Sequence, residues 1–346
     1  MILNIHNIVS IRLNNESTSV RAFIGDELGY FINSNSNSNS DLADIDIFFV
    51  KRIDNLEDFI DISDTLKYFK NTICCKYGGG HISIKCFDDN CSKMELYIEE
   101  SVDSFWVLYV IEKLLMIILP MKGFLLMHAS ASVRNNIEAT MYTGSKASGK
   151  TENVLKDVDS GCEFIGDEFI IADQNANCYC YPRRVNIHKF NTNRYWMILR
   201  KKILSEILNL RSLNSALPVF PARSYIEVLV RLIIRRSRYK GYIRLSIFDY
   251  LSQTVISSKA KIGKLIIFDN MKNSIESDSE LIQYLHNSNM AEYFRRIEQD
   301  ILMSIVDKNI KKIPLAKYVK KSMAIHDQIL SEFVHSIDNF EVLKKS

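Results

Sequence analysis

The chain has little proline and little glycine, 5 and 12 residues among 346. Because these two residues dominate turns and interrupt regular elements, their scarcity argues against a turn-rich β-sandwich and favours long helices and strands. Residues 1–8 also lack a basic segment, a continuous apolar run and a small-residue cleavage site. We therefore predict no signal peptide and a cytoplasmic location.

Long apolar runs are lacking as well. The most apolar stretch, residues 105–119, is interrupted by Glu112 and Lys113 and is followed by Pro120. It falls short of the roughly 20 residues that a membrane-spanning helix needs. The stretch therefore predicts a buried helix near residues 103–119, and we expect no membrane association.

The cysteines form no CxxC pair, and their number, seven, is odd. Two interpretations are open: a metal site built from Cys178, Cys180 and a distant pair, or reduced and partly buried thiols. The second is typical of a cytosolic protein and is favoured. The cysteines are Cys74, Cys75, Cys86, Cys91, Cys162, Cys178 and Cys180.

The two halves of the chain differ in charge. A composition of 47% hydrophobic and 25% charged residues is that of an ordinary globular protein rather than a disordered one. The net charge is +3, yet residues 190–346 carry 26 Lys and Arg against 15 Asp and Glu, so residues 1–189 are acidic. This asymmetry suggests an acidic or polyanionic partner for the second half. Nucleic acid is the weakest candidate because no base-stacking aromatic motif is present.

One stretch matches the phosphate-binding loop pattern G-x-x-x-x-G-K-[ST]. In such a loop, backbone N–H groups wrap around phosphate oxygens, the lysine adds a positive charge, and the hydroxyl holds Mg²⁺. The helix that follows adds its positive N-terminal end. The residues expected to bind ATP are Gly144, Ser145, Lys146, Ala147, Ser148, Gly149, Lys150 and Thr151, followed by Glu152.

The surroundings of this loop favour a nucleotide site over a glycine-rich surface turn. Residues 137–142 alternate as a buried strand does, and Val154, Leu155 and Val158 give the next segment a helical apolar face. Gly161 lies where the C-terminal cap of that helix is expected. The order strand, loop, helix is the context in which this motif binds nucleotides.

Two adjacent carboxylates, Asp167 and Glu168, interrupt the short apolar stretch 162–171. Phosphoryl transfer needs a carboxylate for the metal ion and a group that orients or deprotonates the attacking hydroxyl. Asp167 follows Lys150 by 17 residues, which is room for one helix and a return strand. The two acids are therefore expected beside the loop.

This compact arrangement resembles the HPr kinase/phosphorylase family, whose core is similar to that of ATP-dependent phosphoenolpyruvate carboxykinase. The segments 127–130 (Met-His-Ala-Ser) and 181–184 (Tyr-Pro-Arg-Arg) are similar to further segments of HPr-kinase-like proteins. The resemblance covers about residues 100–190 and implies an α/β fold with a mixed-sheet P-loop core. The family run is matched without insertion at Gly144, Gly149, Lys150, Thr151 (for Ser), Glu152, Gly161 and Asp167.

The chain also departs from that family. Glu168 stands at the second acidic position, as in a broader set of HPr-kinase-like proteins, and no downstream Glu-x-Arg-Gly signature is present. These departures separate the chain from the kinases that act on HPr itself. We keep the chemistry of the family and do not carry over its protein substrate.

The resemblance and the chemistry of phosphoryl transfer imply roles for the matched residues. Lys150 draws charge toward the bridge between the β- and γ-phosphates, and Thr151 binds Mg²⁺. Glu168 is expected as a second metal contact. Asp167 is implied to be the base for the acceptor hydroxyl and is also a candidate ligand of the metal ion.

Four further residues are candidates for the site, of which His128 and Glu152 are of second rank. His128 is either a core histidine or, by resemblance, a group near the phosphates, and Glu152 follows the loop directly. One of Arg183 and Arg184 is expected to neutralise charge on the transferred group. The alternative for this pair is an exposed basic turn.

These features predict an ATP- and Mg²⁺-dependent kinase that transfers the γ-phosphoryl group to a hydroxyl. A serine of an acidic peptide or protein is the first choice of acceptor, since the second half of the chain is basic. A small-molecule hydroxyl is the second choice. A regulatory module that binds ATP without transfer is the alternative outside enzymes, and a homo-oligomer stays open.

The rest of the sequence divides into three predicted parts. These are a mostly β N-terminal domain over 1–100, the catalytic core over 101–275 and a helical C-terminal extension over 276–346. The polar tract 33–40 predicts a loop. Strands are expected at 5–13, 19–24, 45–51, 81–86, 94–98, 123–133, 137–142 and 264–269.

The second half predicts amphipathic helices near 193–212, 223–239, 279–287, 290–306 and 318–336. One of them carries Arg231, Arg235 and Arg238 on a single face. That face is either solvated or a docking surface for an acidic peptide, a phosphorylated product or nucleic acid.

Overall fold

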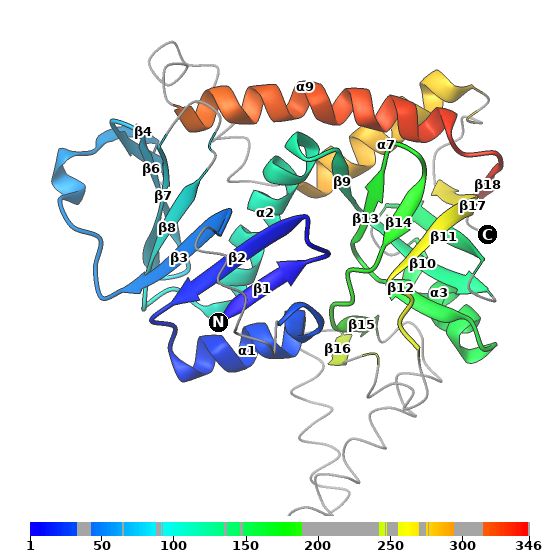
Figure 1. Cartoon of the computed structure of the whole chain (residues 1–346), viewed down its shortest axis with the longest axis horizontal. Coiled ribbons are helices and arrows are strands. Elements are labelled where there is room, and N and C mark those ends of the chain that lie inside the picture. Colours follow the sequence, from blue (N-terminus) through cyan, green and yellow to red (C-terminus); the bar gives the residue numbers. More distant parts are fainter. Residues whose placement is uncertain are drawn as a thin grey trace, which may run out of the picture.

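The computed structural model describes residues 1–32, 43–63, 66–87, 91, 93–134, 137–145, 148–188, 242–245, 247, 255–269, 275, 277–293 and 314–344. These residues form a mixed α/β fold with two large mixed sheets, a short two-stranded sheet and a few helices. The two large sheets stand on either side of the apolar helix α2, and α9 crosses over both (Figure 1).

The first sheet has the strand order β1-β2-β3-β8-β7-β6-β5-β4. Its inward side chains pack against α1 (Thr18–Leu28) and α2 (Ser104–Met121) in one apolar cluster. The strands are β1 (Ile2–Ile5), β2 (Val9–Asn14), β3 (Ile45–Val50), β4 (Ile60–Ser63), β5 (Leu66–Phe69), β6 (Thr72–Tyr77), β7 (Gly80–Cys86) and β8 (Met94–Glu99).

One strand prediction in this region is wrong, and another is confirmed only in part. Residues 19–24 belong to α1, because Ser17 caps the helix by accepting a bond from the Val20 N–H, and Ile24 and Leu28 continue a buried helical stripe. Of the strand predicted at 5–13, residues 9–13 lie in β2, whereas Ile5 ends β1 and residues 6–8 form the turn between the two strands. Strands β4 to β6 were not predicted. Those at 45–51, 81–86 and 94–98 are confirmed.

Helix α2 is long and apolar enough to cross a membrane by length and composition alone. In the fold, Val107, Ile111 and Leu115 are buried in the apolar cluster of the first sheet. The predicted buried helix is therefore confirmed. Glu112, which interrupts the apolar run, is also buried.

The second sheet has the strand order β12-β10-β11-β17-β14-β13-β9, and β18 also pairs with β17. Strand β17 confirms the prediction at 264–269 and lies parallel to β11. The strands are β9 (Phe124–Met127), β10 (Ala129–Arg134), β11 (Glu138–Gly144), β12 (Glu163–Gly166), β13 (Ile170–Asp173), β14 (Asn177–Tyr179), β17 (Lys259–Asp269) and β18 (Phe340–Lys344).

Helices cover both faces of this sheet. On one face, Ser132 and Tyr142 bond to Asp157 of α3 (Lys150–Asp159). On the other face, Ala139 and Met141 share an apolar cluster with α7 (Asp278–Tyr293) and α9 (Pro314–His335). Helices α7 and α9 confirm the predictions at 279–287 and 318–336, whereas β18 was not predicted.

The two ends of the second sheet meet at one place. Strands β9 and β12 lie at opposite ends of the strand order, yet β9 continues into β10 through His128. In the same way, β12 continues into β13 through Asp167 and Glu168. The predicted single strand at 123–133 and the apolar stretch 162–171 are therefore two strands each, and both breaks carry candidate site residues.

All seven cysteines are buried and free of disulfides. Burial raises the pKa of the Cys178 thiol to about 12, and Cys178 Sγ donates to the carbonyl oxygen of Ala260. These properties are those of buried thiols. Strands β15 (Val185–His188) and β16 (Tyr242–Leu245) pair with each other. The predicted polar loop 33–40 and helices 193–212 and 223–239, and nearly all of 290–306, lie outside the described residues.

Candidate active site

Strand β11 leads into the predicted loop, and α3 begins directly after it, so the expected order of strand, loop and helix is confirmed. Gly144 has φ +147°, and a Cβ atom there would lie 2.5 Å from the carbonyl oxygen of Phe268. Gly149 has φ +106° at the N-terminal cap of α3. Both positions therefore require glycine. Lys146 and Ala147 lie outside the described residues.

Lys150 turns its side chain back into the loop. Its ammonium group donates to the carbonyl oxygens of Gly144 at 2.6 Å and Ser145 at 3.1 Å. Only 7% of the residue is exposed. Nearby, Ser148 Oγ is buried and has no hydrogen-bond partner among the described residues. The loop therefore holds a buried cation and an unsatisfied hydroxyl.

Asp167 faces the loop from the break between β12 and β13. Its carboxylate accepts from Thr151 Oγ1 at 3.0 Å and from Ser130 Oγ at 2.6 Å. Burial raises the pKa of the Asp167 carboxyl, and the neighbouring Glu168 adds to that rise. The two hydroxyl bonds and the charge of Lys150 act in the opposite direction.

Ser130 was not among the predicted site residues. It lies on β10, two residues after His128, and its side chain is fully buried. The segment 129–132 alternates alanine with serine, which is unusual for a buried strand and could have pointed to hydroxyls facing a polar group.

Glu168 has different neighbours from Asp167. Its carboxylate lies 3.5 Å from Arg183 Nη1 and accepts a 3.4 Å bond from Asn186 Nδ2. The side chain is 35% exposed, and the backbone has φ +73°. A non-glycine residue in this region is strained, and such strain gathers at functional sites. The two adjacent acids therefore differ in burial and in partners.

The structure separates the two candidate arginines. Arg183 is buried, with Nη1 at 2.7 Å from Glu112 of α2 and Nε at 4.0 Å from Glu27 of α1. Arg184 is 31% exposed and pairs at 2.7 Å with the exposed Asp26. Arg183 therefore connects the helices of the first sheet to Glu168.

His128 and Glu152 flank the site in sequence. His128 is 5% exposed in the break between β9 and β10, and its carbonyl oxygen accepts a 3.4 Å bond from Thr143 Oγ1. Its ring lies 6.1 Å from the ring of Phe169. Glu152 lies in the first turn of α3. A carboxylate at that position is favourable with the helix dipole.

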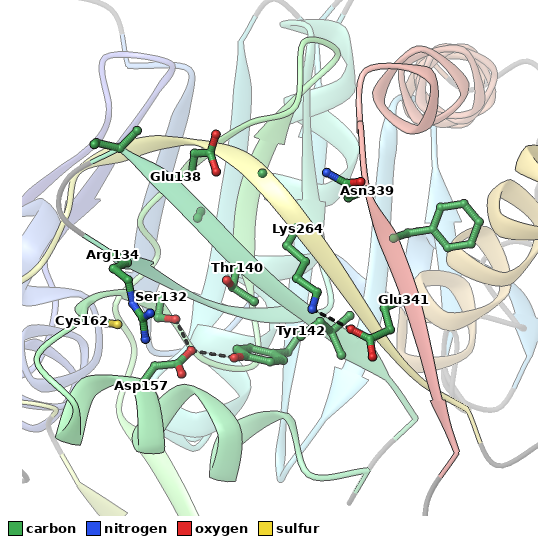
Figure 2. A pocket seen from close by; sticks show the side chains of 15 residues that line it. Ser132, Arg134, Glu138, Thr140, Tyr142, Asp157, Cys162, Lys264, Asn339 and Glu341 are labelled. Carbon is green, nitrogen blue, oxygen red and sulfur yellow. Dashed lines mark hydrogen bonds and ion pairs between the residues drawn. The ribbon is translucent and has the colours of Figure 1, made fainter.

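A hollow of about 880 Å³ lies on the α3 face of the second sheet. Figure 2 shows Asp157 receiving bonds from Ser132 and Tyr142 on one side of it, and the ion pair between Lys264 and Glu341 on the other. Seven residues separate Asp157 from Lys150, or about 10 Å along the helix. The described residues that line the hollow include none of the loop 144–151, so the two sites are distinct. The hollow was not predicted from the sequence.

The candidate site thus brings together Lys150, Thr151 and Asp167, with Glu168 and Arg183 on the neighbouring side. No family model matches the chain, and no curated protein does either.

Proposed function

We propose that this protein is an ATP-dependent kinase that transfers the γ-phosphoryl group to a hydroxyl. The observation that carries the proposal is the contact between Thr151 of the loop and Asp167 of the acidic turn. In P-loop enzymes, a loop hydroxyl and a strand carboxylate together hold Mg²⁺. The spacing of 3.0 to 3.1 Å between these oxygens suits two ligands of one small cation.

The loop residues fit a triphosphate. Gly144 lets the loop begin close to the Phe268 carbonyl oxygen, where a Cβ atom would collide, and the ammonium of Lys150 lies within the loop. The buried, unsatisfied hydroxyl of Ser148 is a donor for a phosphate oxygen. A bound Mg²⁺ ion would neutralise charge on the phosphates, with Thr151 and Asp167 as its protein ligands.

This geometry favours a change in the roles of the two acids. Asp167 is buried and already bonded to two hydroxyls, whereas Glu168 is 35% exposed. A base must reach the acceptor hydroxyl. We therefore assign Asp167 to the metal ion and Glu168 to the acceptor proton, with Arg183 as the residue that positions Glu168.

The proposal includes the family resemblance. Strand β11, the loop, α3 and the return to β12 follow the order that the HPr kinase-like core would require. His128 lies in the break between β9 and β10, and Ser130 on β10 bonds to Asp167 of the acidic turn. A histidine-alanine segment of that family is expected at this place. The proposed fold class is accordingly a P-loop core of the HPr kinase and phosphoenolpyruvate carboxykinase type.

A serine of an acidic peptide or protein is the proposed acceptor. The support is the charge asymmetry, since residues 190–346 carry an excess of Lys and Arg. Association with an acidic polypeptide would be favoured by this field and weakened by salt.

A single-turnover incubation with γ-labelled ATP and Mg²⁺ tests the proposal. Acidic serine-containing peptides, small hydroxyl compounds and buffer alone are compared, with the Lys150→Ala variant as control. We expect label on a peptide serine with the parent chain and none with the variant. Label on a small hydroxyl compound instead of a peptide would show that the acceptor is a small molecule. ATP binding with no label on any acceptor would instead support a regulatory module.

A further inference from the structure

A second cluster of ligand-type side chains lies between α7 and α9, on the sheet face opposite α3. His286 of α7 and His326 of α9 turn the same ring atom, Nδ1, toward one oxygen, Oδ1 of Asp327. The two distances are 3.0 and 3.2 Å. One ligand atom from each of the three residues lies within 4.8 Å of the other two.

We propose that His286, His326 and Asp327 bind a divalent transition-metal ion, with Zn²⁺ as the expected occupant. Imidazole nitrogen and carboxylate oxygen are its usual ligands, and three protein ligands plus water form a common site. Mg²⁺ and Ca²⁺ prefer oxygen alone, so the two nitrogens argue against them.

The distances suit this ion. Neighbouring ligand atoms in a tetrahedral zinc site are about 3.3 Å apart. Both nitrogen–oxygen distances are already close to this value. The widest separation in the set is at most 4.8 Å, so ion binding requires the ligand atoms to move together by no more than about 1.5 Å. A cation would take the place of the two N–H bonds to the shared oxygen.

The three proposed ligands differ in burial, so the site is enclosed on one side and open to solvent on the other. His326 is 9% exposed, and its ring meets that of His286 edge to face at 6.1 Å, so the two imidazoles hold each other in place. The side chain of Asp327 is 56% exposed. Solvent therefore reaches the carboxylate side, which gives an ion an entry path and leaves a position for water.

The ion would connect two helices that contribute to one apolar layer. Leu285 of α7 and Phe333 of α9 belong to the same buried cluster behind β11. Helix α9 then leads into β18, which pairs with β17 beside β11. The site is thus a structural tie for the layer that supports the loop strand. It does not depend on the proposed kinase function.

Zinc titration of the untagged, full-length chain tests the proposal by calorimetry and by thermal unfolding with and without Zn²⁺. The variants are His286→Ala and the milder Asp327→Asn. The matched control is His335→Ala, which removes another histidine from the same helix pair, where His335 Nε2 lies 3.8 Å from Asp278. We expect one Zn²⁺ per chain, a raised melting temperature, at least tenfold weaker binding in both variants, and unchanged binding in the control.

Two results would overturn the metal site. One is the absence of saturable Zn²⁺ binding by the parent chain, and the other is equal binding by the parent and both variants. Substitution with Co²⁺ gives a separate readout, because cobalt–thiolate absorption would place the ion on a cysteine instead. Lys150→Ala should bind Zn²⁺ as the parent does, so this test stands apart from the test of the kinase.

Discussion

Thr151 Oγ1 lies 3.0 and 3.1 Å from the two carboxylate oxygens of Asp167, although the two residues belong to different elements. Thr151 is in the first turn of α3, and Asp167 lies in the break between β12 and β13. The contact fixes the start of the loop helix against the acidic turn. Most of the proposed chemistry depends on this pair and on its neighbour Glu168.

Substitutions of Asp167 and Glu168 should have different effects on Mg²⁺–ATP binding and on phosphoryl transfer. Asp167→Asn removes the proposed metal carboxylate, so we expect affinity for Mg²⁺–ATP to fall at least tenfold together with loss of transfer. Glu168→Gln should leave that affinity within about twofold and lose transfer, because the proton acceptor is gone. Calorimetry and γ-labelled transfer assays measure the two effects. Normal Mg²⁺–ATP affinity in Asp167→Asn, with transfer lost, would return the role of base to Asp167.

The stability of the parent chain should depend on the protonation of Asp167. Burial raises its pKa above the ordinary 3.8. The folded protein therefore keeps this proton to higher pH than the unfolded chain does. The resulting stabilisation is complete below pH 3.8 and is lost as the pH rises through the raised pKa.

Asp167→Asn removes this dependence. The variant should gain free energy of unfolding relative to the parent as pH rises, by about 1.4 kcal/mol for each pH unit between the two pKa values. Urea unfolding at acidic and at mildly alkaline pH measures the gain. Asp26→Asn, at a side chain that is 57% exposed, is the control. A difference between Asp167→Asn and the parent that stays the same at both pH values would contradict the prediction.

The two neighbouring arginines should differ in their effect on stability. Arg183→Met removes a guanidinium that faces the buried Glu112 and Glu27, and loss of one partner from such a cluster costs about 3–5 kcal/mol. Arg184→Met breaks a partly exposed pair with Asp26, which costs about 0–1 kcal/mol. Chemical unfolding of both variants compares them directly. Equal losses would mean that the buried cluster does not stabilise the fold.

Two glycines with positive φ provide a matched test of the loop. In Gly144→Ala the new Cβ would lie 2.5 Å from the Phe268 carbonyl oxygen, so strain and overpacking together should cost about 3 kcal/mol or more. Gly161 has φ +90° with no atom within 4 Å, so Gly161→Ala should cost only about 1–2 kcal/mol.

Nucleotide binding gives the second readout of this pair. We expect it to be lost in Gly144→Ala and kept in Gly161→Ala, because only the first substitution enters the loop. Fluorescence titration with a labelled ATP analogue measures both. Undiminished binding by Gly144→Ala would show that nucleotide binding does not depend on the close approach of the loop to Phe268.

Sequence reasoning located the elements whose pattern is local. The apolar face of α3, the glycine Gly161 at its C-terminal end and the apolar run of α2 all follow from spacing within one segment. The strand predicted at 19–24 from its alternating pattern is wrong, because the same residues also fit a helix that Ser17 caps. A short apolar pattern that fits both the strand period of 2 and the helix period of 3.6 does not decide between them. The choice depends on what the segment packs against.

The site was predicted only in part, for a related reason. The loop and the acidic pair were visible as motifs, but the partners of each acid depend on how the ends of the second sheet meet. Ser130 reaches Asp167 across 37 residues, and Glu112 reaches Arg183 from another layer of the fold. Such long-range contacts leave no spacing signal in one sequence.

Calorimetric titration of the parent chain with ATP, with and without Mg²⁺, tests the kinase proposal most directly, with Lys150→Ala as control. We expect saturable binding of one nucleotide that requires Mg²⁺ for full affinity and is lost in the variant. No binding by the parent, or binding that neither Mg²⁺ nor Lys150 affects, would contradict a phosphate site formed by the loop and Asp167.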